Sequence, residues 1–280
     1  MAGVEIESPA NPRIRGAMAL RERRDREATG LTLVDGAREA LRAITSGIEV
    51  ETAFVCRALL EPSHGQAALE ALGRGRGRRE IVEVSARAFE RLAFGDRADG
   101  LVLVVHQPST ELDRLSLPVH PLVVVTEDVE KPGNLGAILR SADGAGVAAV
   151  VAAGGTDLYN PNVIRASVGT VFSVPVAAAE AREVRAWLLA RGLRIVATRV
   201  DAATLHVDAD LRGGVALVLG SEANGLSDAW RGDDVESIRL PMLGVADSLN
   251  VSASAAILVY EAWRQRRADV AERSEPPQSA

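Results

Sequence analysis

The second half of the chain contains three short segments that each join an apolar run to a tight turn and a few polar side chains. They are Asn134-Leu-Gly-Ala-Ile-Leu-Arg140, Leu219-Gly-Ser-Glu-Ala-Asn-Gly225 and Leu240-Pro-Met-Leu-Gly-Val-Ala-Asp-Ser-Leu-Asn250. Each lies where a parallel α/β sheet would end a strand, and open α/β sheets bind ligands outside the carboxyl ends of their strands. The segments therefore predict an α/β fold in which strand ends from distant parts of the sequence meet at one pocket.

Apolar runs and helical patterns alternate along the chain, which favours α/β architecture throughout. The 280 residues are enough for two modest domains, and a polar, proline-bracketed stretch at 107–119 is typical of a linker. We expect a smaller N-terminal α/β domain over residues 1–106 and a C-terminal parallel-sheet α/β/α domain over 120–266. Residues 267–280 are expected to form a disordered tail.

Turn and cap residues predict where several elements begin and end. Asn134 is expected to cap a helix that runs to Ala145. The apolar residues 171–174 are expected to form a strand. Ser248 is expected to cap a final helix that ends at Arg264.

Composition excludes several kinds of site and protein. Cys56 is the only cysteine, so an internal disulfide or a cysteine-rich metal site is excluded, and we expect this thiol to be buried in a strand. The four histidines have no ligand spacing, so we expect no metal. No apolar run approaches the roughly 18 residues of a membrane span, and no signal-peptide pattern is present. We expect a soluble cytoplasmic protein.

The net charge of −6 argues against a nucleic-acid partner, but the distribution of charge does not. Residues 1–110 carry equal numbers of acidic and basic residues, with arginines concentrated in 13–26 and 74–79. The planar arginine fork is suited to phosphate. The composition of residues 73–79 predicts a flexible basic loop. This loop either contacts phosphates or is only solvated.

The common nucleotide and hydrolase motifs are absent: the sequence has no P-loop, no Rossmann glycine pattern and no nucleophile elbow. Arg140 lies six residues after Asn134, in a stretch that reads as closely packed helix, so we expect it to need an anionic partner. Glu222 follows a buried strand and precedes the Asn224-Gly225 turn. Taken singly, these features fit an ordinary capped helix and a structural turn equally well.

Taken together, the three segments resemble the motifs of the SpoU–TrmH family of RNA 2′-O-ribose methyltransferases over about residues 120–265. Residues 11–14 and 31–36 resemble the substrate-binding domain that many members carry, which is similar in fold to a large-subunit ribosomal protein (L30e-like). The resemblance implies a trefoil knot in the C-terminal domain, a homodimer, and S-adenosylmethionine as cofactor. By the family pattern, the cofactor-binding residues are Thr198, Gly220, Leu240, Met242 and Leu249.

The resemblance also implies methyl transfer to a ribose 2′-hydroxyl. It assigns the catalytic roles to Arg140, Asn134, Glu222, Ser248 and Asn250. A free guanidinium has a pKa above about 12 and is a costly base at neutral pH. We therefore expect the arginine to clamp an RNA phosphate and orient the hydroxyl. Further RNA contacts are expected from Arg165, Arg13, Arg15 and Arg23.

Structured RNA is the expected partner, with 23S ribosomal RNA favoured over tRNA. Three alternatives remain: a tRNA ribose methyltransferase, a methyltransferase that acts on a tRNA base, and a non-catalytic RNA-binding module. The intact set of polar residues argues against the last, because a decayed site should have lost some of them. Binding of S-adenosylmethionine would discriminate between an enzyme and a binding module.

Overall fold

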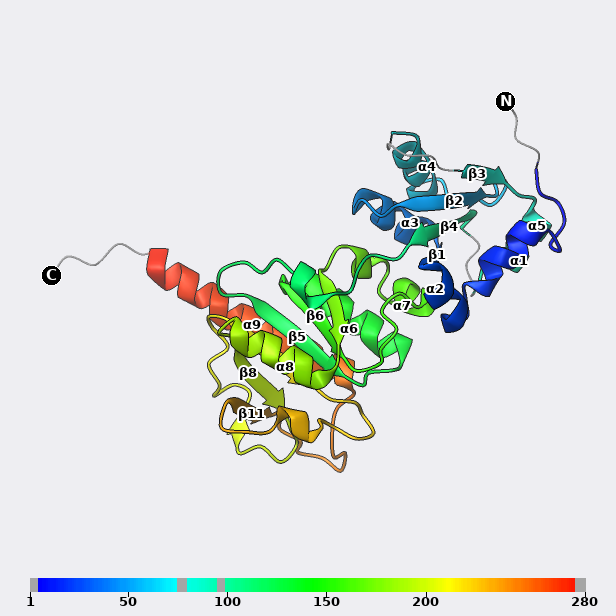
Figure 1. Ribbon diagram of the computed structural model, residues 1–280. Helices are drawn as coiled ribbons and strands as arrows, with labels where there is room; N and C mark the ends of the chain where they lie inside the picture. The colour runs from blue at the N-terminus through cyan, green and yellow to red at the C-terminus, as the bar shows by residue number, and fades with distance from the viewer. Residues whose placement is uncertain (1–4, 75–79, 95–98, 275–280) are drawn as a thin grey trace. The chain divides into compact units, whose positions relative to one another are not determined.

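The computed structural model describes residues 5–74, 80–94 and 99–274, with side chains to Arg267 (Figure 1). The chain forms two compact units. Unit 1 consists of Met1–Pro108 and Asp157–Ser173, and unit 2 of Ser109–Thr156 and Val174–Ala280. Residues 75–79 of the predicted basic loop and 275–280 of the predicted tail lie outside the described residues.

Unit 1 is built on a four-stranded mixed sheet with strand order β1-β4-β2-β3. Strand β4 pairs antiparallel with β1 and β2, and β3 pairs parallel with β2. The five apolar residues that begin β4 are all buried, which explains why this strand is central. Cys56 is buried with a free thiol, as expected, but it directly follows β2 and is not part of a strand. The strands are β1 Leu31–Asp35, β2 Val50–Val55, β3 Glu80–Glu83 and β4 Leu101–His106; the helices are α1 Pro12–Ala19, α2 Arg23–Thr29, α3 Ala37–Thr45, α4 His64–Arg74 and α5 Ala86–Leu92.

Unit 1 is completed by a segment that interrupts unit 2 in the sequence. This segment carries α7 (Pro161–Ala166) and the 3₁₀ turn η2 (Thr170–Phe172). The Thr32 hydroxyl on β1 donates a 2.7 Å hydrogen bond to the carbonyl oxygen of Tyr159. Arg26, only 2% exposed, pairs with Asp157. Because buried polar groups need such partners, the segment satisfies groups that unit 1 cannot pair by itself.

The strand expected at residues 171–174 is wrong. Gly169 has a φ of +79° and begins a 3₁₀ turn there. The amide of Phe172 then donates to the Gly169 carbonyl at 3.1 Å, which is the hydrogen bond of a turn and not of a ladder. The extended backbone starts only at β7, Val176–Ala179.

Asp35, at the end of β1, is a buried acid inside unit 1. Its Oδ2 accepts hydrogen bonds of 2.9 Å from the Arg165 guanidinium and 2.9 Å from the Phe94 amide. Burial raises the pKa of Asp35 to about 6; the Phe94 amide and Arg165 oppose this rise, whereas the nearby Asp99 and Glu39 add to it. The folded protein therefore holds this proton more tightly than the unfolded chain does.

We expect the stability of the wild type relative to Asp35→Asn to increase as the pH falls from about 7 to about 4. The pKa of Asp35 in the native protein is above the unfolded value of 3.8. Protonated Asp35 therefore contributes its full stabilisation below about pH 4, and this contribution is lost as the pH rises through about 6. Across this pH range the contribution of Asp35 to the free energy of unfolding changes by about 3 kcal/mol. Denaturant unfolding of both proteins at several pH values measures it, and parallel pH dependences would contradict the assignment.

Unit 2 contains a seven-stranded sheet in which every pair of neighbours is parallel, with strand order β7-β6-β5-β10-β8-β11-β9. All residues of β5, β6 and β10 are buried. Such continuously buried strands occur where a parallel sheet is covered on both faces. The expected parallel α/β architecture is confirmed. The remaining strands are β5 Leu122–Glu127, β6 Ala149–Ala153, β8 Arg194–Thr198, β9 Thr204–Leu205, β10 Val215–Leu219 and β11 Val235–Arg239.

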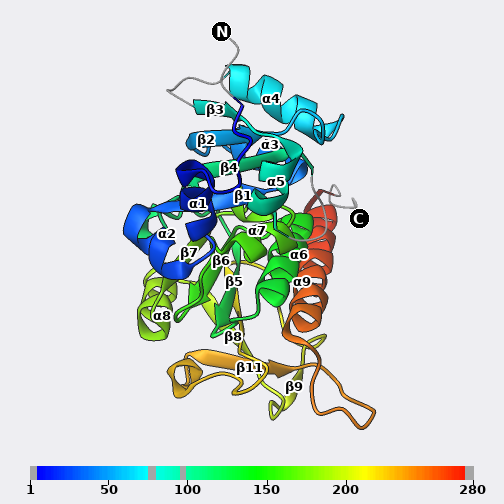
Figure 2. The same ribbon diagram turned by 90° about the vertical axis from the view of Figure 1, so that its right-hand side faces the viewer.

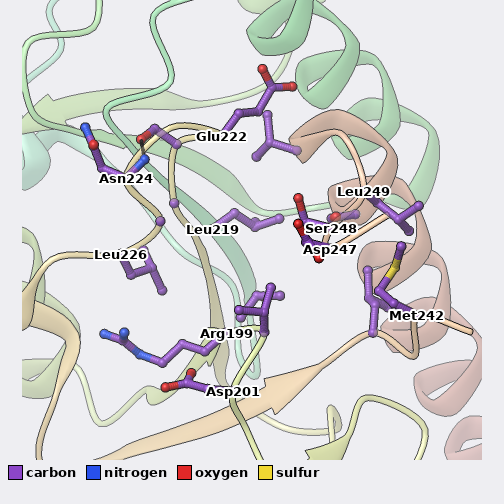
Figure 3. Close-up of a pocket in the computed structure, with 18 of the residues that line it drawn as sticks. Arg199, Asp201, Leu219, Glu222, Asn224, Leu226, Met242, Asp247, Ser248 and Leu249 are labelled. Carbon is purple, nitrogen blue, oxygen red and sulfur yellow. Dashed lines mark hydrogen bonds between the residues drawn. The ribbon is translucent and has the colours of Figure 1, made fainter. Parts of the chain in front are cut away.

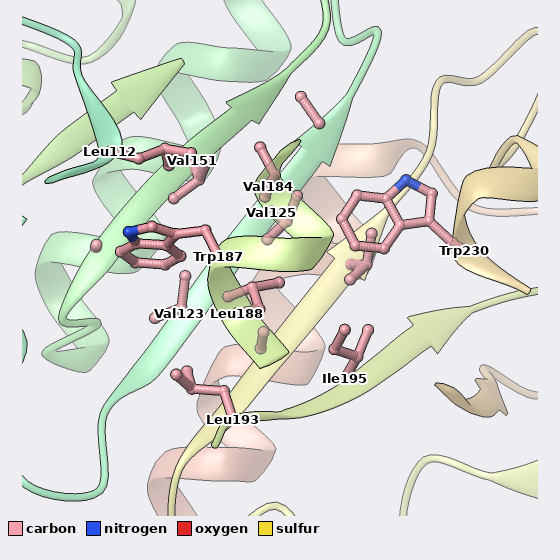
Figure 4. Close-up of a cluster of buried hydrophobic side chains, with 14 of the residues drawn as sticks. Leu112, Val123, Val125, Val151, Val184, Trp187, Leu188, Leu193, Ile195 and Trp230 are labelled. Carbon is pink, nitrogen blue, oxygen red and sulfur yellow. The ribbon is translucent and has the colours of Figure 1, made fainter. Parts of the chain in front are cut away.

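Helices cover both faces of this sheet. Figure 2 shows α6 (Pro132–Ala145) and α9 (Val251–Ser274) side by side on one face and α8 (Ala181–Ala190) on the other. On the α8 face, the indoles of Trp187 and Trp230 pack among the aliphatic side chains of the sheet (Figure 4). The 3₁₀ turns of unit 2 are η1 Leu112–Arg114 and η3 Asp228–Trp230.

Two expected caps and one expected helix end are wrong. Helix α6 begins at Pro132, with Lys131 at its N-cap, because proline favours the first turn of a helix. Asn134 is therefore inside the first turn. Helix α9 begins after Asn250, whose Oδ1 accepts the Ser252 amide at 2.9 Å, so Ser248 is not the cap.

Helix α9 also continues to Ser274, beyond the expected end at Arg264. Just past that position, the Arg266 guanidinium donates to the carbonyl oxygens of His120 at 2.8 Å and Gly213 at 2.6 Å. These bonds hold the helix against the sheet. Among the described residues, no helix is long and apolar enough to cross a membrane.

Candidate active site

The carboxyl ends of β8, β10 and β11 border one cavity of about 520 Å³ in unit 2 (Figure 3). Leu219 ends β10, Leu226 follows the turn after it, and Met242 and Leu249 lie between β11 and α9. Small-molecule sites measure roughly 300–1,000 Å³. Strand ends that are distant in sequence thus meet at one pocket with room for a small ligand.

All five residues predicted to bind the cofactor line this cavity, namely Thr198, Gly220, Leu240, Met242 and Leu249. Two of the predicted catalytic residues, Glu222 and Ser248, line it as well. The structure therefore brings these seven residues together, and their roles in binding and catalysis stay predictions.

Four charged residues that line the cavity were not among the site residues predicted from the sequence: Arg199, Asp201, Arg231 and Asp247. The Arg199 guanidinium donates to the carbonyl oxygens of Ser227 at 3.1 Å and Trp230 at 3.3 Å. Arg199 and Asp201 directly follow β8. Thr198 was selected by the family resemblance, whereas a search for polar residues just after a strand would have found both Arg199 and Asp201.

Two buried polar atoms at this cavity have no hydrogen-bond partner among the described residues. They are Oγ1 of Thr198 and Nε of Arg199. Buried polar atoms are usually paired. Together with the apolar lining and the exposed Asp247 carboxylate, they fit a ligand that has an apolar body, polar edges and positive charge, as S-adenosylmethionine has.

The turn after β10 depends on a close approach between two glycines. A Cβ atom added to Gly220 would overlap the carbonyl group of Gly225 and lie 2.6 Å from the amide nitrogen of Leu226. Gly225 itself has a φ of +64°, which favours glycine. This turn holds Ser221 and Glu222 at the edge of the cavity.

Glu222 is the centre of a polar cluster that joins three segments. Lys131 Nζ donates to Glu222 Oε2 at 2.6 Å, and Asn134 Nδ2 donates to Oε1 at 3.1 Å. Asn250 Nδ2 donates to the same Oε1 and, at 3.1 Å, to Oδ1 of Asn134. Three predicted catalytic residues are therefore bonded to one another.

The cluster borders a second cavity of about 120 Å³, which shares Ser221, Glu222 and Val251 with the larger one. The hydrogen bond from Lys131 is the largest cause that lowers the pKa of Glu222, and the bonds from Asn134 and from the Val251 amide act in the same direction. Glu222 is therefore a carboxylate whose oxygens already accept hydrogen bonds. It is suited to orienting its neighbours and not to removing a proton.

A glutamate that was not predicted from the sequence supports the loop after β10. Glu127 ends β5 and is only 4% exposed. Its carboxylate accepts the Ser227 amide and the Ser227 hydroxyl, each at 2.7 Å. The pair connects the end of β5 to the loop after β10. Its sequence signal is a charged residue at the carboxyl end of a strand that begins with a buried apolar run.

Arg140 does not join the cluster. It is exposed, lines neither cavity, and its guanidinium has no partner within the described parts of the chain. The expectation that it lies in a closely packed face is wrong, because its neighbours Leu139 and Ala142 take the buried positions of α6. A free guanidinium on this helix is available for an anion from outside.

The four arginines predicted to bind RNA all lie in unit 1. Arg13 pairs with Glu80 at 2.8 Å, and Arg23 pairs with Glu27 at 2.7 Å. Both arginines and both glutamate partners are exposed. Arg15 is exposed as well. Arg165 differs, because its guanidinium bonds Asp35 and the Phe94 carbonyl oxygen inside the unit. The described residues contain no cluster suited to a metal ion.

Comparison with known families accounts for this arrangement. Residues 121–260, half of the chain, match the SpoU rRNA Methylase family. This chain belongs to the SpoU rRNA methylase family. Residues 11–103 match the MRM3-like substrate binding domain, so the SpoU-family domain is preceded by the kind of domain that the sequence resemblance implied.

Relatives of this SpoU-family chain match nearly its whole length. A 23S rRNA (uridine(2479)-2′-O)-methyltransferase of Streptomyces viridochromogenes is 34% identical over 88% of this chain and 87% of that protein. A solved RNA 2′-O ribose methyltransferase is 42% identical, with a TM-score of 0.81, over 94% of this chain and 99% of that one. An AdoMet-bound rRNA methyltransferase of Sinorhizobium meliloti is 27% identical, with a TM-score of 0.83, over 93% and 97%.

Proposed function

We propose that this protein transfers a methyl group from S-adenosylmethionine to a ribose 2′-hydroxyl of 23S ribosomal RNA. The observation that carries the proposal is the position of Glu222, which borders the larger cavity and also holds Asn134 and Asn250. A cofactor-sized pocket and a polar cluster therefore meet at one side chain. The names of the relatives support the same reaction and the same RNA.

When bound, S-adenosylmethionine supplies an electrophilic methyl group on a positively charged sulfur. Thr198, Gly220, Leu240, Met242 and Leu249 would hold it, through backbone groups and apolar contacts. The Asp247 carboxylate at the same cavity favours a cationic ligand, and Ser248 adds a hydroxyl group beside it.

The acceptor hydroxyl must be oriented and must lose its proton. Asn134 and Asn250 present carboxamide groups, and we propose that they hold the ribose at the smaller cavity. Arg140 would bind the adjacent phosphate, and that phosphate would assist proton removal. Positioning of this kind can lower a barrier by roughly 7–11 kcal/mol in ideal cases.

We propose that unit 1 grips the RNA through Arg13, Arg15 and Arg23. Their guanidinium groups are exposed, and arginine binds phosphate oxygens bidentately. Because Arg165 is occupied by Asp35, its RNA contact would require an exchange of partners. The proposed domain limits remain 1–106 for this part and 120–266 for the methyltransferase part, with Asp157–Ser173 packed into unit 1.

We further propose that the protein acts in the cytoplasm as a homodimer with a knotted C-terminal domain. Ile257, Tyr260 and Trp263 recur every three residues on α9 and are 39%, 47% and 40% exposed, which leaves an apolar face to cover. Membership of the SpoU rRNA methylase family supports the knot. Sedimentation is expected to give twice the 29.5 kDa chain mass.

The test of the reaction is methyl transfer from S-adenosylmethionine with a tritiated methyl group to 23S rRNA that lacks modification, with tRNA in parallel. A 2′-O-methyl group blocks alkaline cleavage of the next phosphodiester bond. We expect label in alkali-resistant dinucleotides of 23S rRNA. Label in bases, label only in tRNA, or no cofactor binding by calorimetry would each contradict the proposal.

A further inference from the structure

Lys131 is the only lysine among the 32 basic residues of the chain. It stands at the N-cap of α6, directly before the turn that carries Asn134. Its Nζ lies 2.6 Å from Glu222 Oε2, in an ion pair in which the lysine is 74% exposed and the glutamate 30%.

Lys131 is the one cation among the described residues that line the smaller cavity. The acids bordering that cavity are Asp128, Glu130 and Glu222. The pKa of Asp128 is raised by burial and by its neighbours Glu127 and Glu130, so negative charge is crowded there. The larger cavity is lined by two further acids, Asp201 and Asp247, and by two arginines, Arg199 and Arg231. Removal of Lys131 would leave Glu222 facing uncompensated acids.

The ionised state of Glu222 fixes the orientation of two carboxamides. A carboxylate only accepts hydrogen bonds, so Asn134 and Asn250 must both turn Nδ2 toward it. Asn134 Oδ1 is then available to accept Asn250 Nδ2, and Asn250 Oδ1 accepts the Ser252 hydroxyl at 2.6 Å. A protonated Glu222 would donate from one oxygen and allow either amide to flip.

We propose that Lys131 is a positioning residue whose ammonium group holds the Glu222 carboxylate where it orients the carboxamides of Asn134 and Asn250. This inference rests on the proposed function, because the two amides are there assigned to the acceptor ribose. Lysine suits the position because its compact ammonium group offers three donors on one atom. One of these is used on Glu222.

The test compares Lys131→Met, Lys131→Arg and Arg114→Met in the full-length protein. Arg114 is a matched control: it is 71% exposed, pairs with Glu111 at 3.0 Å and lines neither cavity. The first readout is the pH profile of kcat for methyl transfer to 23S rRNA. The second is the titration of the Glu222 carboxyl carbon by NMR in the protein alone, assigned with Glu222→Gln.

We expect the acid limb of the kcat profile of Lys131→Met to move to higher pH. On that acid limb its kcat falls by up to about fivefold, the scale of one exposed ion pair, with a smaller loss at higher pH. The KM for S-adenosylmethionine stays unchanged, Lys131→Arg recovers most of the activity, and Arg114→Met behaves as the wild type. By NMR the pKa of Glu222 is higher in Lys131→Met than in the wild type, because the main cause that lowers it is gone.

An unchanged Glu222 titration, or an unchanged pH profile in an active enzyme, would overturn the role of Lys131. Inactivity of the wild type on every RNA would instead reject the proposed function, and the NMR titration would still decide whether Lys131 controls Glu222. A uniform loss of kcat at all pH values, with the titration unmoved, would indicate a structural effect and would also reject the inference.

Discussion

Arg140→Ala is expected to lower kcat for methyl transfer by at least about 100-fold, the scale on which single catalytic groups act. The guanidinium is exposed on α6, the helix that also carries Asn134, and it is free to bind a phosphate. Affinity for S-adenosylmethionine should not change, because Arg140 does not line the larger cavity. Single-turnover kinetics on 23S rRNA and calorimetry with the cofactor measure the two effects separately.

Two companion variants make the Arg140 experiment specific. Arg140→Lys keeps the charge but loses the planar fork, so it should recover only part of the activity if a phosphate is bound bidentately. Arg264→Ala removes a similarly exposed arginine whose partner is Glu261 and should leave kcat unchanged. Turnover by Arg140→Ala at the wild-type rate would refute the assigned role.

Gly220→Ala is expected to abolish measurable cofactor binding and to lower the free energy of unfolding by about 1–3 kcal/mol, as overpacking does. The added methyl group would overlap backbone atoms of the Gly225 carbonyl, and backbone cannot swing aside as a side chain can. The turn would have to open, and Glu222 would move with it. Calorimetry and denaturant unfolding are the two measurements.

Gly214→Ala is the matched control for this substitution. Gly214 precedes β10 and Gly220 follows it, so both glycines flank the same strand. A Cβ atom at Gly214 would meet only side-chain atoms, at 3.6 Å and 4.0 Å. Gly214→Ala should bind the cofactor normally. Equal behaviour of the two variants would show that the Gly220–Gly225 approach is not what shapes the pocket.

The pocket could be predicted from sequence because its chemistry follows strand ends. Buried apolar runs mark β5 and β10, and the polar residue after such a run must lie at the carboxyl edge of the sheet. Gly220 was found in this way together with the family resemblance, and Thr198 was found through the family resemblance alone. The same rule would have found Glu127 and Asp201, which were overlooked.

Other features are invisible in the sequence because they depend on which groups meet in space. The bond between Lys131 and Glu222 joins residues 91 positions apart, and nothing in the local pattern at either residue indicates the other. Asn134 reads as a helix cap, yet its amide bonds Glu222 instead. Arg165 reads as a phosphate contact, yet Asp35 occupies it inside unit 1.

The segment Asp157–Ser173 limits where the chain can be truncated. A reading frame stopped after the codon for Pro108 would encode a fragment in which the buried Arg26 guanidinium and the Thr32 hydroxyl have lost Asp157 and Tyr159. The complementary fragment would carry α7 without the rest of unit 1, against which this helix packs. A graft of unit 1 onto another enzyme must therefore import α7 as well, spliced in through an engineered connection.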